Sequence, residues 1–110
     1  MKLIRCVVRP HKVDDIRRAL VSVNAAAVAV TEVKDHGPQS WYTTVWLGRE
    51  WRVDFLPKME LELVAHDDDV DEIVTVIIRA ARTDGIAEGY VYVMPVEHRY
   101  NIHTGERNVS

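Results

Sequence analysis

Four segments of the chain alternate apolar and polar residues or are rich in β-branched residues, a pattern typical of β-strands. They are residues 2–8 (KLIRCVV), 25–34 (AAAVAVTEVK), 58–66 (KMELELVAH) and 90–98 (YVYVMPVEH). The third is the clearest, because Met59, Leu61 and Leu63 alternate with glutamates. We predict that the first strand ends at Arg9 and Pro10, since proline cannot donate a hydrogen bond to a neighbouring strand.

Two other segments repeat apolar residues every three or four positions, the spacing of an amphipathic helix. The apolar positions of the first are Val13, Ile16, Leu20 and Val23, and those of the second are Val70, Ile73, Val74, Ile77 and Ala81. The second opens with Asp67, Asp68 and Asp69. Negative charge is favourable at a helix N-terminus, so we interpret these aspartates as helix-start residues in preference to a metal cluster.

The order of the elements predicts an α+β fold. Strand, helix and strand occur twice in succession, which is the βαββαβ order of a ferredoxin-like sandwich. Right-handed crossovers would place both helices on one face of a four-stranded antiparallel sheet. The other face would stay open and still carry apolar residues, which in a small domain usually indicates oligomerisation.

The segment between the second and third predicted strands, residues 35–57, is long and aromatic. It contains all three tryptophans, Trp41, Trp46 and Trp51, together with Tyr42, and we find no helical or strand register in it. Long loops in compact domains are usually functional, and aromatic residues are frequent anchors of protein interfaces. We interpret the segment as a partner-binding arm; the alternative is that it folds back and buries its tryptophans.

Composition limits the function. The 110 residues fit a single domain, 1–110, and the net charge of −3 gives no reason to expect nucleic-acid binding. No stretch resembles a signal peptide or a membrane span, so we expect a cytoplasmic protein. The lone cysteine, Cys6, reads as a core residue.

No catalytic or metal-binding set is evident. The five histidines, His11, His36, His66, His98 and His103, are scattered without the spacing of metal ligands. Ser40 has no base partner, and Cys6 has no neighbouring cation that would lower its pKa. We therefore predict that the protein is not an enzyme and has no metal site.

Several motifs resemble the PII signal-transduction protein family. They are RPHKVDDIRRAL at 9–20, TEVK at 31–34, VDFLPK at 53–58, IIRAARTDGI at 77–86 and TGE at 104–106. The combination of TEVK and VDFLPK is specific, and the similarity extends from Met1 to about Glu106 without a gap. The resemblance implies a homotrimer of ferredoxin-like subunits in which residues 35–57 form the T-loop, an arm that inserts into transporters, enzymes or regulators.

The resemblance also implies a nucleotide site in each cleft between subunits. In the family this cleft binds ATP or ADP, and 2-oxoglutarate joins through the Mg-ATP complex. The positions that would contact the nucleotide or effector are Val7, Gln39, Lys58, Glu62, Val64, Ala87, Gly89, Tyr90, Asn101 and His103. Gln39 and Lys58 are retained from the family pattern, although Lys58 also suits the simpler role of a strand-end cation.

The phosphate-binding loops depart from the family pattern. The usual TGxxGDGK is here TDGIAEGY, at 83–90, with Tyr90 in place of a lysine. Two usual arginines before TGE are replaced by Asn101 and His103. Each charge-assisted hydrogen bond contributes about 1.5–3 kcal/mol, so we expect weak ATP binding. A tryptophan at position 51, where many members have a modifiable tyrosine, excludes nucleotidylation there.

We therefore predict a PII-like trimeric signalling protein that senses a small-molecule effector. The candidate ligands are ADP, AMP and ATP, and the residues alone do not establish that any of them binds. Its partner would be a membrane transporter or a cytoplasmic enzyme, bound through residues 37–55 with Trp41, Tyr42, Trp46 and Trp51 as anchors. The alternative is a PII-like protein of metal-efflux or bicarbonate-uptake context that binds a metal or an anion.

Overall fold

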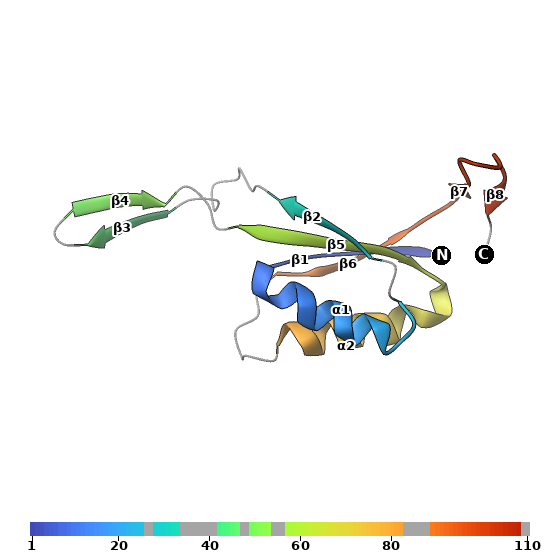
Figure 1. Ribbon diagram of the computed structural model, residues 1–110, viewed down its shortest axis with the longest axis horizontal. Coiled ribbons are helices and arrows are strands. Elements are labelled where there is room, and N and C mark those ends of the chain that lie inside the picture. The colour runs from blue at the N-terminus through green and yellow to red at the C-terminus, as the bar shows by residue number, and fades with distance from the viewer. Residues whose placement is uncertain (26–27, 34–41, 47–48, 54–56, 83–88, 109–110) are drawn as a thin grey trace.

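A computed structural model of the protein describes most of the chain (Figure 1). The described residues are 1–25, 28–33, 42–46, 49–53, 57–82 and 89–108. None of the helices in these ranges is long and apolar enough to cross a membrane.

A four-stranded sheet forms the centre of the molecule. Its strands are β1 (Lys2–Val8), β2 (Ala29–Val33), β5 (Lys58–Ala65) and β6 (Val91–Pro95). They lie in the order β2-β5-β1-β6, and all three neighbouring pairs are antiparallel. This arrangement confirms the predicted ferredoxin-like α+β fold.

Two helices lie on one face of this sheet (Figure 1). They are α1 (Val13–Val21) and α2 (Val70–Ala81), and each follows a short 3-10 turn, η1 (Pro10–Lys12) and η2 (Asp67–Asp69). Both helices begin with acidic residues in their first turn, where the helix dipole favours negative charge. The predicted helix-start role of the three aspartates is therefore confirmed in the form of η2.

The core lies between the helices and the sheet. Its fully buried members are Ile4, Ile16, Leu20, Leu61 and Ile77. Burying a side chain of this kind stabilises the fold by about 1.5–3 kcal/mol relative to leaving it exposed. Because successive strand residues point to opposite faces, burial of Ile4 and Leu61 on the helix side leaves Arg5 and Glu62 on the open face.

The second strand begins later than the sequence suggested, at Ala29 instead of residue 25. The reason is the end of α1. Asn24 has a left-handed φ of 59°, the amide of Ala25 donates to Leu20 O (2.9 Å), and the amide of Asn24 donates to Val21 O (3.1 Å). This is the Schellman pattern of helix termination, and it takes up Ala25, the first residue of the predicted strand.

The arm contains regular structure, so the prediction that it has no strand register is wrong. Strand β3 (Tyr42–Trp46) pairs antiparallel with β4 (Arg49–Val53), and Trp46 lies opposite Arg49. The two strands pair only with each other in the described part of the chain. Figure 1 shows this hairpin projecting well beyond the end of the central sheet.

The C-terminal segment also contains structure that the sequence did not reveal. Strand β7 (Arg99–Tyr100) pairs with β8 (Arg107–Asn108) in a two-stranded ribbon. The fourth strand of the main sheet is correspondingly shorter than predicted, ending at Pro95 instead of residue 98. Pro95 lies opposite Lys2, the first residue of β1, and the amide of Val96 donates to Met1 O (3.2 Å), so the pairing stops where its partner strand begins.

Candidate effector site

The residues that the sequence nominates for the effector lie in two separate places. Val7, Lys58 and Tyr90 lie toward the end of the sheet where β1 stops and where β5 and β6 begin, whereas Asn101 and His103 lie in the turn of the β7–β8 ribbon. Figure 1 shows the ribbon at the opposite end of the sheet. One chain therefore does not bring the two groups together.

Gly89 has a backbone that requires glycine. Its φ is +101°, and a Cβ at this position would approach the carbonyl oxygen of Val7 to 3.3 Å. Both features disfavour any side chain, because L-residues rarely adopt this conformation and the carbonyl belongs to a paired strand. Gly89 thus fixes how the chain enters β6, directly before Tyr90.

The phenol of Tyr90 is largely in the open. Its side chain is 77% exposed, and its ring lies 6.3 Å from the ring of Tyr92, tilted by 45°. This distance is within the range of favourable aromatic pairs. The structure therefore places an exposed aromatic surface where the family pattern has a lysine.

An ion-pair fork occupies the middle of the open sheet face. The Nε of Arg5 lies 2.6 Å from Oε1 of Glu60, and the terminal nitrogen NH2 lies 2.8 Å from Oε2 of Glu62. The Nε also donates to Oε2 of Glu62 at 2.9 Å. The hydrogen bond to Glu62 is the largest cause of a raised pKa of Arg5, so the guanidinium stays charged.

The sequence motifs nominate Glu62 but not Arg5 or Glu60. The missing signal was the strand register, which puts Arg5 directly opposite Glu62. Charged residues at alternate positions on neighbouring strands suggest such a pair only when the register is known. With one positive and two negative groups, the fork carries a net charge of −1.

Lys58 and Val64 lie near opposite ends of β5. Lys58 is its first residue, lies opposite Val33 of β2 and is half-buried. Val64 lies opposite Leu3 and is exposed on the open face of the isolated chain. The two residues are thus on the sheet, but Val64 is closer to the end that carries the ribbon.

Asn101 organises its own turn. Its side-chain oxygen accepts hydrogen bonds from the amides of His103 (2.8 Å) and Thr104 (3.1 Å). The backbone adds a bond from Gly105 N to Asn101 O at 2.7 Å, and Gly105 has a φ of 72°. An asparagine used in this way retains only its amide nitrogen for a ligand.

The remaining nominated residues are on or near the arm and the 83–88 segment. Gln39, Trp41 and Ala87 lie outside the described residues. Tyr42 and Trp46 are in β3 and Trp51 is in β4, but the structure describes only the backbone there. The described residues contain no group of three or more histidine, cysteine, aspartate or glutamate side chains arranged to hold a metal.

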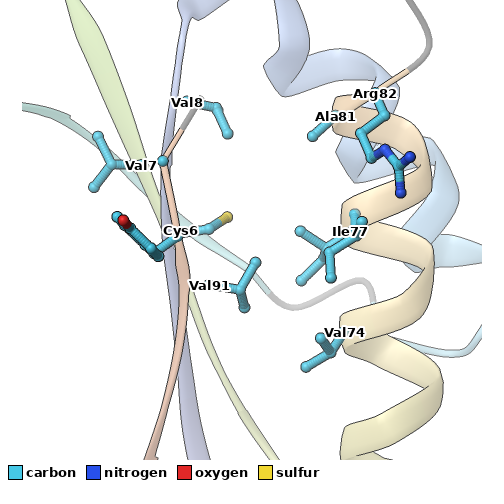
Figure 2. Close-up of a pocket in the computed structure, with 11 residues that line it drawn as sticks. Cys6, Val7, Val8, Val74, Ile77, Ala81, Arg82 and Val91 are labelled. Carbon is cyan, nitrogen blue, oxygen red and sulfur yellow. The ribbon is translucent and has the colours of Figure 1, made fainter. Parts of the chain in front are cut away.

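A cavity of about 610 Å³ lies between the sheet and α2, on the helix side. Figure 2 shows the sulfur of Cys6 directed toward α2, where Val74 and Ile77 face it, while Val7 points away. Arg82 and Gly89, which border the undescribed residues 83–88, also line the cavity. Cys6 is itself buried, with 2% of its surface exposed.

Burial raises the pKa of the Cys6 thiol, so we expect it to react slowly. Removal from water raises its pKa from 9.0 to about 11, because the thiolate is poorly solvated there. At pH 8 we expect alkylation by iodoacetamide to be about a hundredfold slower in the folded protein than in the unfolded one, since only the thiolate reacts. Mass spectrometry of the labelled chain checks this, and equal rates would contradict it.

The same shift predicts a pH dependence of stability. The folded pKa lies above the unfolded one, so between about pH 9 and 11 the unfolded chain loses a proton that the folded chain keeps. The contribution of Cys6 is therefore complete below pH 9 and declines as the pH rises toward 11. The Cys6→Ala variant, measured by chemical denaturation at each pH, is expected to lack this decline.

Comparison with known proteins agrees with the fold and with the motifs. The family model described as Nitrogen regulatory protein P-II matches residues 1–106. Nitrogen regulatory protein P-II 1 of Escherichia coli (strain K12) is 44% identical over 108 residues, covering 98% of this chain and 96% of that protein. Nitrogen regulatory protein P-II of Pasteurella multocida (strain Pm70) is 40% identical over 108 residues, with the same coverage. The chain therefore belongs to the nitrogen regulatory protein P-II family.

Proposed function

We propose that the protein is a homotrimeric, non-enzymatic cytoplasmic regulator that senses an adenine nucleotide and controls a transporter or an enzyme through the arm at residues 35–57. The observation that supports this proposal is that the predicted effector-site residues of one chain lie at opposite ends of the sheet. Tyr90 and Gly89 lie at one end of the sheet and His103 lies at the other. A cleft that uses both groups needs two neighbouring chains.

The open face of the sheet supports assembly. Leu3 and Val7 are half-buried there although neither α1 nor α2 covers this face, and Val64 is 38% exposed. A face with these side chains and an ion-pair fork suits an interface between copies of one chain. We expect light scattering to give a mass three times the 12.6 kDa of one chain; a monomer at micromolar concentration would contradict the trimer.

The effector site has fewer cations for a polyphosphate than the family pattern. Tyr90, Asn101 and His103 replace one lysine and two arginines of the family pattern, and Asn101 has its side-chain oxygen engaged in its own turn. We expect isothermal titration calorimetry to show weak ATP binding. Tight, Mg-dependent binding of ATP that 2-oxoglutarate strengthens would contradict this prediction.

A gain-of-function variant makes the test sharper. Tyr90→Lys and His103→Arg together restore two charges, and we expect ATP affinity to rise by about tenfold or more for each, since charge-assisted hydrogen bonds are worth about 1.5–3 kcal/mol. Arg17→Lys on the exposed face of α1 is the control. Heat on titration with bicarbonate or a divalent metal, but with no nucleotide, would favour the metal-efflux or bicarbonate-uptake alternative.

A further inference from the structure

We propose that Arg5 is a positioning residue of the effector site, which holds the carboxylate of Glu62 so that it accepts a hydrogen bond from a neutral donor of the ligand. The inference rests on the proposed function, because it assumes that an adenine ligand reaches Glu62. It concerns a residue of the open sheet face that the sequence motifs did not nominate.

The fork fixes Glu62 from one side. The Nε and NH2 of Arg5 both reach Oε2 of Glu62, at 2.9 and 2.8 Å. A guanidinium holds a carboxylate in a defined orientation because its donors are planar and rigid. We assign the other oxygen of Glu62, Oε1, to the ligand.

Without Arg5 the arrangement would be unstable. Glu60 and Glu62 are two residues apart on β5, so both carboxylates project from the same face of the sheet and repel each other. Arg5 lies opposite Glu62 and also reaches Oε1 of Glu60 at 2.6 Å. Removing the guanidinium releases both side chains, and Glu62 then samples other rotamers.

The charge of the fork selects the kind of group that binds. Two carboxylates and one guanidinium leave a net charge of −1, which repels a phosphate and attracts a hydrogen-bond donor. Tyr92, which lies directly opposite Arg5 on β6, adds an aromatic surface next to the fork. A nucleoside offers a flat base and a ribose with two hydroxyl donors, so we assign Oε1 of Glu62 to a ribose hydroxyl.

The experiment compares ligands that differ in one hydroxyl. Adenosine, 2′-deoxyadenosine and 3′-deoxyadenosine are titrated by calorimetry into the protein and into Arg5→Met, Arg5→Lys and Glu62→Gln. We expect the unaltered protein to bind adenosine about tenfold or more tighter than one of the deoxy compounds, because a hydrogen bond to a charged acceptor is lost. In Arg5→Met the difference falls to about threefold or less, and Arg5→Lys restores part of it.

Arg17→Met is the matched control, because it removes an exposed arginine from α1 without touching the open face. It is expected to keep the full discrimination. Thermal unfolding and light scattering of each variant separate local from global effects. A purely structural role for Arg5 would weaken all three ligands equally, and that result overturns the inference.

Failure of the two proposals can be told apart. If the unaltered protein binds none of the adenine ligands, the proposed function and the role of Arg5 are both wrong. If it binds them and Arg5→Met keeps the full difference between adenosine and its deoxy forms, only the role of Arg5 is wrong. If it does not discriminate between adenosine and either deoxy compound, the assignment of Glu62 to a ribose hydroxyl is wrong.

Discussion

Replacing Ile77 with alanine is expected to lower the free energy of unfolding by about 2–5 kcal/mol. The side chain is 1% exposed and belongs to the core between α2 and the sheet. Truncation removes apolar contacts and enlarges the space next to Cys6 and Val74, which already border a cavity. Chemical denaturation at a fixed protein concentration measures the loss.

The neighbouring isoleucine is a matched control. Ile78 is the next residue of α2 and has the same side chain, but it is 38% exposed. We expect Ile78→Ala to cost about 1 kcal/mol or less, since much of its surface is already in water. Equal losses for the two variants would contradict the assigned orientation of α2. A large loss for Ile78 alone would place it in an interface.

The helices and the third predicted strand could be predicted because each carries its full pattern of apolar and polar residues within its own stretch of sequence. In α2 the residues Ile73 and Ile77 recur at helical spacing and both are buried, and in β5 Leu61 and Leu63 alternate with glutamates and are buried as well. An amphipathic pattern of this kind reports directly on which face meets the core. The fold followed from placing these faces on one side of a sheet.

The turns and short pairings could not be foreseen, because their stability depends on single residues or on a partner strand. Asn24 ends α1 through a left-handed backbone, and Asn101 closes the β7–β8 turn through its side chain. Neither residue belongs to a periodic pattern. The β3–β4 hairpin was missed because its two strands are only five residues long and polar residues occupy both faces.

The candidate site could be predicted from the sequence only in part, for the same reason. Motifs nominate residues such as Glu62 and Tyr90 one at a time, whereas the fork of Arg5 with Glu60 and Glu62 arises from the pairing of β1 with β5. The sequence separation of Arg5 and Glu62 is 57 residues, so no local pattern joins them. Register is the information that connects them.

The pairing within the arm leads to a second prediction of large effect. Trp46 lies opposite Arg49, and Trp51 lies opposite Thr44. Because alternate strand positions belong to one face, positions 46 and 51 fall on the same face of the two-stranded ribbon. Two neighbouring tryptophan positions on a hairpin that pairs with no other described strand suit the anchor of a partner surface.

We therefore expect Trp46→Ala and Trp51→Ala to leave the thermal unfolding of the protein nearly unchanged, within about 0.5 kcal/mol. The two strands of the hairpin are not part of the central sheet, which is why we expect truncation of these tryptophans to affect unfolding little. We expect the two variants instead to bind a partner protein more weakly, because truncation of a tryptophan anchor typically costs about 2 kcal/mol or more of binding free energy. A tryptophan buried against the body would behave in the opposite way and cost about 3–5 kcal/mol of folding stability. Differential scanning calorimetry of both variants, measured beside Ile77→Ala, decides between docking and burial of the tryptophans. A fall in melting temperature as large as that of Ile77→Ala would show that the arm packs its tryptophans onto the body and does not dock through them.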